Sequence, residues 1–172
     1  MDWTAASGFA AAVSAGAAAI AAGANWLQSR HAARANSVTV YLEMMKEYTS
    51  PEMRTAISDL ATFWERLERG QSVADAYRDL STHKPERAAE LRGMSRMASY
   101  YFVNAAKLFE AKMIDEALLK LLVTQSGLNV FYDVAVPINL VRNPNDNSSR
   151  YAQLLKTVVP VHGSGLYKRN GS

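Results

Sequence analysis

The sequence predicts an all-α protein, in which an N-terminal Ala/Gly-rich transmembrane helix precedes a cytosolic helical bundle of about four to five helices. Three observations favour this fold class. Residues 3–29 contain no Asp, Glu, Lys or Arg, apolar residues recur at helical spacing from Asn36 onward, and no strand pattern extends beyond a few residues. The predicted parts are a transmembrane helix over 1–29, a juxtamembrane stalk helix over 30–50, a helical bundle over 51–158 and a flexible tail over 159–172.

The two ends of the uncharged segment predict a membrane-spanning helix. As one helix, it places Trp3 and Trp26 roughly 34 Å apart, which is close to the thickness of a bilayer. Tryptophan prefers the membrane interface, so the pair is typical of the aromatic belts at both ends of a span. Arg30 and Arg34 follow the segment, and Asp2 is the only charged side chain before it. The positive-inside rule therefore puts the N-terminus outside and the C-terminal domain in the cytoplasm.

Two features complicate a simple anchor. The sequence "AGA" at residues 22–24 resembles the cleavage site of a secretory signal peptide, although Asp2 replaces the positive charge expected near its start. Twelve of the twenty-one residues from Thr4 to Ala24 are alanine, so insertion of a single isolated copy is predicted to be marginal.

Small residues line one narrow face of this helix at about 100° per residue. They are Gly8, Ala12, Gly16, Ala19 and Gly23. Small residues at this spacing let helix backbones approach closely in lipid. The segment is therefore predicted to pack against other membrane helices, either copies of itself or those of a larger membrane complex.

Local signals divide the rest of the chain into helices. A stripe from Val38 to Tyr48 predicts that the stalk helix continues to the sequence "TSPEM", where Ser50 is an N-cap and Pro51 the first helical residue. That second helix is expected to end at Gly70, as a glycine after the last turn. The sequence "SVAD" at residues 72–75 predicts a capping box and a short third helix.

The second half of the bundle is predicted to contain the longest and the most buried helices. A helix of roughly 40 Å is expected from Pro85 to about Met113. The next one begins at Asp115, and its apolar sequence "ALLKLLV" predicts the central, most buried helix. Gly127 and Pro137 are each expected to bend or break it. A last helix is predicted over residues 149–158.

The composition excludes several kinds of chemistry. A chain of 172 residues fits one domain and an appendage, and without cysteine it forms neither disulfides nor thiolate metal sites. Its net charge of +3 is spread along the chain without a basic cluster, so no nucleic-acid partner is predicted. The three histidines lie far apart. Of the two carboxylate pairs at helical spacing, Glu65 with Glu68 has flanking arginines, and Glu86 with Glu90 lies in the first turns of a helix, so both are typical of solvated surface. We therefore predict no catalytic, metal or cofactor residues, no small-molecule substrate and no enzyme.

The segment "YYFVNAAKLFEAKMIDEALLKLL" (residues 100–122), with "YLEMMKEYTSPEMRTAI" (41–57), resembles an uncharacterised group of small bacterial proteins. Members of that group join one N-terminal membrane helix to a cytosolic all-α domain. The resemblance implies structural motifs only: paired aromatic residues, a short hydrophobic-Asp-Glu link and core positions.

The sequence thus predicts a non-enzymatic, single-pass protein of the bacterial inner membrane. Its partners would be the lipid bilayer and other membrane helices, and it would act as an oligomerising or accessory subunit of a membrane complex. Two alternatives stay open. One is a membrane-active effector or toxin whose small-residue helices assemble into a pore. The other is a soluble enzyme or ligand-binding bundle, favoured if Tyr100, Tyr101 and Tyr132 line a deep cavity with a converging carboxylate.

Overall fold

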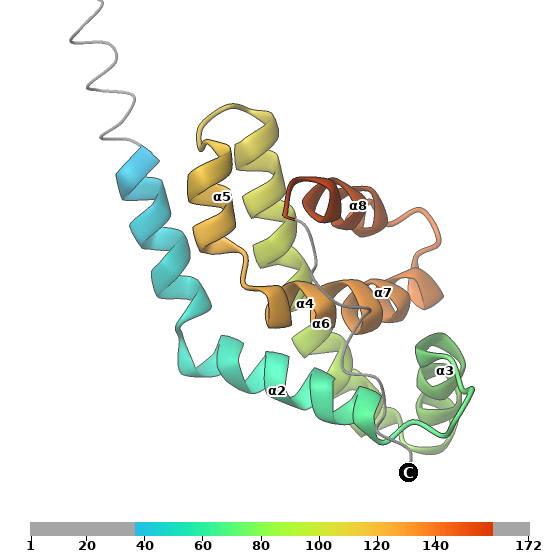
Figure 1. Cartoon of the computed structure of the whole chain (residues 1–172). Helices are drawn as coiled ribbons and strands as arrows, with labels where there is room; N and C mark the ends of the chain where they lie inside the picture. The colour runs from blue at the N-terminus through green and yellow to red at the C-terminus, as the bar shows by residue number, and fades with distance from the viewer. Residues whose placement is uncertain (1–36, 160–172) are drawn as a thin grey trace, which may run out of the picture. The chain divides into compact units, whose positions relative to one another are not determined.

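The computed structural model describes residues 37–159, and every regular element in this range is helical (Figure 1). The all-α prediction is confirmed for these residues. The bundle is the compact unit that begins at Val40. Residues 1–36, which include the predicted transmembrane helix, and residues 160–172 of the predicted tail lie outside the described range.

The helical segment over residues 37–48 contributes to the packing of the bundle from Val40 onward. Met44 is buried, and the Tyr48 ring contacts Tyr101 and Phe102 with centroid distances of 4.9 and 6.3 Å. Leu42, which lies within the predicted stripe from Val38 to Tyr48, is 60% exposed. The C-terminal half of the predicted stalk therefore packs on the bundle.

Helix α2 (Pro51–Glu65) starts as predicted, because the Ser50 side chain accepts a hydrogen bond from the Met53 N–H at 3.1 Å. The predicted end at Gly70 is wrong. The helix ends at Glu65, and Leu67 then turns back into the core. Gly70 has a φ of +87° in the following turn, a conformation that glycine adopts without strain.

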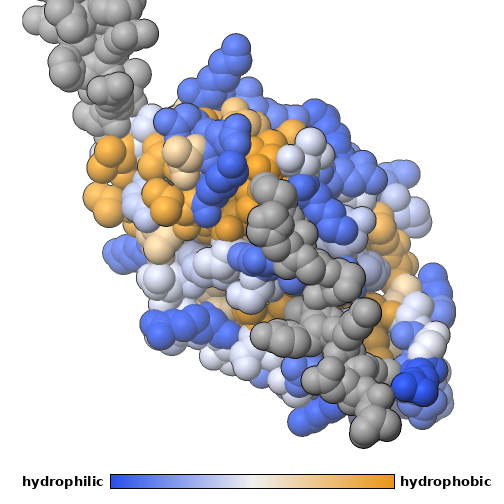
Figure 2. Space-filling model, viewed as in Figure 1, coloured by the Kyte–Doolittle hydropathy of each residue, from blue (hydrophilic) through white to orange (hydrophobic). Residues whose placement is uncertain are grey.

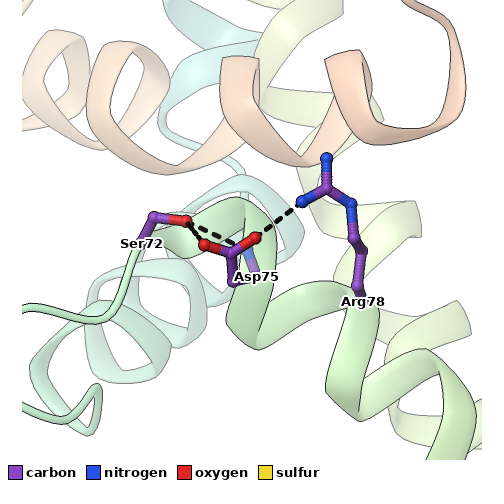
Figure 3. Close-up of polar contacts among 3 residues, drawn as sticks. All are labelled: Ser72, Asp75 and Arg78. Atoms are coloured by element: carbon purple, nitrogen blue, oxygen red, sulfur yellow. Dashed lines mark hydrogen bonds and ion pairs between the residues drawn. The ribbon is translucent and has the colours of Figure 1, made fainter.

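The predicted capping box begins helix α3 (Val73–His83). The Ser72 hydroxyl accepts from the Asp75 N–H at 3.1 Å and donates to Asp75 Oδ2 at 2.7 Å. Figure 3 shows the Asp75 carboxylate between this hydroxyl and the Arg78 guanidinium. The hydrogen bond from Ser72, followed by the attraction of Arg78, lowers the pKa of Asp75.

Helix α4 (Pro85–Glu110) is the central helix, and α2, α3, α5, α7 and α8 all contact it (Figure 1). It ends three residues before the predicted Met113. There, the Met113 N–H donates to Leu108 O and the Lys112 N–H donates to Phe109 O, which is a Schellman motif. Lys112 takes the left-handed position of this motif with a φ of 57°, where glycine is usual.

The prediction of a central, most buried helix after Asp115 is wrong. Asp115 caps helix α5 (Glu116–Leu122) as expected, through a hydrogen bond from the Leu118 N–H to Asp115 Oδ1. However, α5 has only seven residues, and Leu121 is 61% exposed. Such a short helix buries one stripe against α4 and leaves its other side in solvent.

A bend of 78° separates α5 from the helical segment that follows it. That segment consists of α6 (Gln125–Val130), the π-helical η1 (Phe131–Ala135) and α7 (Val136–Arg142). The predicted break at Gly127 is therefore wrong, since the bend lies at residues 123–124. Pro137 does not break the helix either. The preceding π-helical turn changes the hydrogen-bond pattern just where proline cannot donate.

Helix α8 (Ser148–Val158) is the last helix of the bundle and begins one residue before the predicted start at residue 149. It contacts α4, α7 and η1. The fully buried side chains of the core come from most of these helices. They include Met53, Leu60, Leu91, Tyr101, Phe102, Leu119, Leu128, Phe131, Ile138 and Leu155.

Candidate functional site

A cleft of about 630 Å³, called the basic cleft here, opens where α4, α7 and the start of α8 meet. The loop between α7 and α8 forms one wall, and Tyr77 of α3 adds to another. The residues that line it are Tyr77, Arg92, Arg96, Ser99, Tyr100, Val103, Lys107, Ile138, Asn139, Arg142, Asn143, Asn145, Asp146, Asn147, Ser148 and Tyr151.

One face of α4 supplies the largest share of this lining. Its contributions recur three or four residues apart, from Arg92 and Arg96 through Ser99 and Val103 to Lys107. This spacing keeps side chains on one side of a helix. The opposite side of α4 packs against the core, so the basic cleft lies along the side of the central helix that is open to solvent.

Positive charge dominates the basic cleft. Arg92, Arg96, Lys107 and Arg142 line it, whereas Asp146 is the one carboxylate among its described lining residues, which leaves a formal charge of +3. None of the three arginines forms an ion pair with a described carboxylate. Each guanidinium keeps its hydrogen-bond donors for solvent or a ligand.

A chain of buried polar groups leads from the core into the basic cleft. The Ser95 hydroxyl, which is fully buried, lies 3.0 Å from Ala135 O and 2.8 Å from Asn139 Oδ1. The Asn139 amide donates in turn to Ser99 Oγ at 2.7 Å. These bonds orient the Asn139 amide and leave the Ser99 hydroxyl proton available to an acceptor in the cleft.

Ser148, the first residue of α8, carries an unsatisfied polar atom. It is 3% exposed, and its Oγ has no hydrogen-bond partner among the described residues. Its backbone N–H donates to Asp146 Oδ1 at 2.8 Å, while the N-cap Asn147 makes no side-chain capping bond. A buried hydroxyl without a partner destabilises a fold, so this position is unusual for a purely structural serine.

The three tyrosines named in the sequence prediction do not meet in one cavity. Tyr100 lines the basic cleft. The Tyr101 hydroxyl instead donates to Leu122 O at 2.9 Å in the core, where burial raises the pKa of Tyr101. The Tyr132 ring lies 3.4 Å from Lys156 Nζ, a cation–π contact.

A second surface feature is apolar. Figure 2 shows an exposed apolar area over residues 40–48 and α5. The large apolar side chains that are exposed in these two segments include Leu42 and Leu121. A contiguous exposed apolar area is typical of an interaction surface.

Every residue predicted from the sequence to act at the membrane lies outside residues 37–159. The set comprises Gly8, Ala12, Gly16, Ala19 and Gly23 of the packing face, and Trp3, Trp26, Arg30 and Arg34 at the interfaces. In the described range, no single helix is both long and apolar enough to cross a bilayer. Only α5 joined to residues 125–142 has the length and composition, and the 78° bend interrupts that pair. The same range contains no group of three His, Asp or Glu side chains arranged to hold a metal ion.

Sequence reasoning missed the basic cleft. The available signal was the helical spacing of Arg92, Arg96, Ser99 and Lys107, followed 35 residues later by Arg142 and an asparagine-rich turn. The separation hides the fact that these segments are neighbours.

No protein-family model, curated protein or solved structure matches this chain. The resemblance to the group of small bacterial membrane proteins therefore stays a prediction.

Proposed function

We propose that this protein is a non-enzymatic, membrane-anchored helical subunit that self-associates at the membrane, with residues 1–29 as its anchor and the bundle on the cytoplasmic side. The observation that carries the proposal is the exposed apolar area over residues 40–48 and α5. Leu42 follows Trp26 by sixteen residues. A continuous stalk helix over that distance would rise about 24 Å.

A second copy of the chain is the partner that suits this area. The small residues from Gly8 to Gly23 favour close approach of two anchor helices. Two paired anchors would bring residues 40–48 of both copies together, so that the exposed leucines extend one interface from the bilayer into the cytoplasm. A two-fold interface needs only a self-complementary surface, and apolar side chains provide one.

The lining of the basic cleft also supports a binding role. It presents guanidinium, amide and hydroxyl groups, and its one described carboxylate, Asp146, already accepts the Ser148 N–H. Such groups recognise and orient a ligand.

The membrane location predicts how the chain fractionates. Full-length protein is expected in the membrane fraction, to stay there after a high-salt wash and to dissolve in detergent. Deletion of residues 3–26 should move the chain to the soluble fraction with unchanged helical circular dichroism per residue of the bundle. A full-length chain that is soluble without detergent would contradict the anchor.

Self-association predicts sensitivity to two substitutions in the purified, detergent-solubilised protein. Gly16→Leu should reduce the oligomer measured by light scattering or cross-linking, because it adds bulk to the small-residue face. Leu42→Glu should do the same, because it charges the apolar area. Ala10→Leu, on the opposite side of the anchor, and Met97→Glu, at an exposed site on α4, are the matched controls. A monomeric wild-type protein, or equal effects from the controls, would count against self-association.

A further inference from the structure

We propose that the basic cleft binds an oxyanion of the phosphate class, with the Ser148 hydroxyl and the N-terminus of α8 on one side of the anion and Arg92 and Arg96 on the other. This inference goes beyond the proposed membrane subunit. It depends only on described residues of the bundle, so it can fail while the membrane location holds.

The unsatisfied Ser148 hydroxyl is the first reason. It is buried, without a partner and part of the cleft wall. It also sits at the N-terminus of an 11-residue helix whose N-cap residue makes no side-chain bond. Backbone N–H groups in the first turn of a helix have no partner within the helix, and they favour a negative charge. An oxyanion would accept from the hydroxyl and from the N–H groups of the first turn other than that of Ser148, which donates to Asp146 Oδ1.

The second reason is that most groups facing the cleft are donors. The Ser99 hydroxyl has accepted from Asn139 and retains a proton to donate. Arg92, Arg96 and Arg142 carry guanidinium groups without described carboxylate partners. Guanidinium matches the paired oxygens of a phosphate through two parallel hydrogen bonds. A cationic ligand would be repelled by these groups, and a neutral ligand would leave their positive charge uncompensated.

Charge and size distinguish the phosphate class from a simple carboxylate. A formal charge of +3 exceeds what one monovalent carboxylate needs, whereas a phosphate monoester carries up to two negative charges near neutral pH. The cleft of about 630 Å³ is within the range of small-molecule sites, so it has space for more than the anion alone. The Tyr100 and Tyr151 rings and the asparagines of the α7–α8 loop line this remaining space.

Asp146 is the one described group in the cleft that opposes an anion. Its Oδ1 accepts the Ser148 N–H at 2.8 Å, which holds the loop against the start of α8. Its charge is outnumbered by the four cations, so the field in the cleft stays positive. The carboxylate would suit hydroxyl groups on the rest of the ligand better than the phosphoryl group itself.

The test measures binding of inorganic phosphate to the full-length protein in detergent, at constant ionic strength maintained with chloride. We expect a saturable rise in the thermal unfolding midpoint and a matching calorimetric titration. Arg92→Gln combined with Arg96→Gln should weaken binding by at least about tenfold, because two charge-assisted contacts are lost. The matched control is Arg66→Gln combined with Arg69→Gln, which removes the same charge from exposed positions outside the cleft.

Ser148→Ala separates a ligand contact from a structural role. Without phosphate, this variant should unfold at the same temperature as the wild type or higher, because it removes an unsatisfied buried hydroxyl. With phosphate, it should bind at least about tenfold more weakly. Ser95→Ala, which removes a buried hydroxyl that does have partners, should instead lower the midpoint without phosphate.

A second arm distinguishes a free phosphate compound from a lipid headgroup. The protein is reconstituted in nanodiscs of phosphatidylcholine, with or without phosphatidic acid. If phosphatidic acid stabilises the wild type but not the Arg92/Arg96 variant, the anion comes from a lipid. Stabilisation by free phosphate with no difference between the two lipids indicates a soluble compound. Absence of both effects, or equal loss of binding in the Arg66/Arg69 control, would overturn the proposal.

Discussion

Replacing Phe102 with alanine is expected to lower the free energy of unfolding of the bundle by about 3–5 kcal/mol. Phe102 is completely buried in α4. Its ring stacks on Phe131 with centroids 5.0 Å apart and meets the Tyr101 ring edge-on at 5.2 Å. Truncation removes these contacts and leaves a cavity between α4 and η1. The backbones of α4 and of the helical segment over residues 125–142 are too constrained to move together and fill this cavity.

Chemical unfolding of full-length protein in detergent, followed by circular dichroism, measures this loss. Tyr100→Ala is the matched control, because Tyr100 precedes Tyr101 on the same helix but is 64% exposed. Its effect should stay within about 0.5 kcal/mol. Similar losses for Phe102→Ala and Tyr100→Ala would contradict the placement of α4 at the centre of the bundle.

Gly127→Ala is expected to destabilise the bundle by about 1–3 kcal/mol, although alanine is the better helix former. A Cβ at this position would overlap the Tyr48 hydroxyl and approach Phe102 Cζ and Thr124 Oγ1 to 3.0 Å each. Thr124 caps α6 and hydrogen-bonds to Tyr48, so the new methyl group would push apart the junction that holds the bend.

Gly93→Ala provides the control with the opposite sign. Gly93 lies within α4, and a Cβ there would meet nothing within 4 Å. This substitution should raise the free energy of unfolding by about 0.5–1 kcal/mol, because alanine is more favourable than glycine in the interior of a helix. If Gly127→Ala stabilises the protein as Gly93→Ala does, that result would contradict the close packing of Tyr48 and Thr124 against Gly127.

The candidate site shows how far a single sequence can lead. Its cationic residues on α4 repeat at helical spacing, so their shared face was readable from the sequence. Their partners were not, because Asn139 and Ser148 come from segments more than 30 residues away in the chain. The unsatisfied hydroxyl of Ser148 is a property of burial, which no local pattern reports.

The sequence by itself determined the helical class and most helix starts. Ser50, Ser72 and Asp115 each cap a helix as predicted, and Pro51 and Pro85 each open one. These signals act within one turn, since a cap contacts a backbone N–H only two or three residues away. The membrane segment is also a sequence-level prediction, and it awaits the fractionation experiment.

Only the tertiary structure decided where the apolar second half bends, which helix is central and what the cleft contains. The bend at residues 123–124 lies where Tyr48 contacts Thr124 across 76 residues of chain. The central role of α4 depends on the five helices that pack around it. The physical reason is the range of the forces: capping and helix propensity act between near neighbours in the chain, whereas burial and charge complementarity depend on which distant segments become neighbours in space.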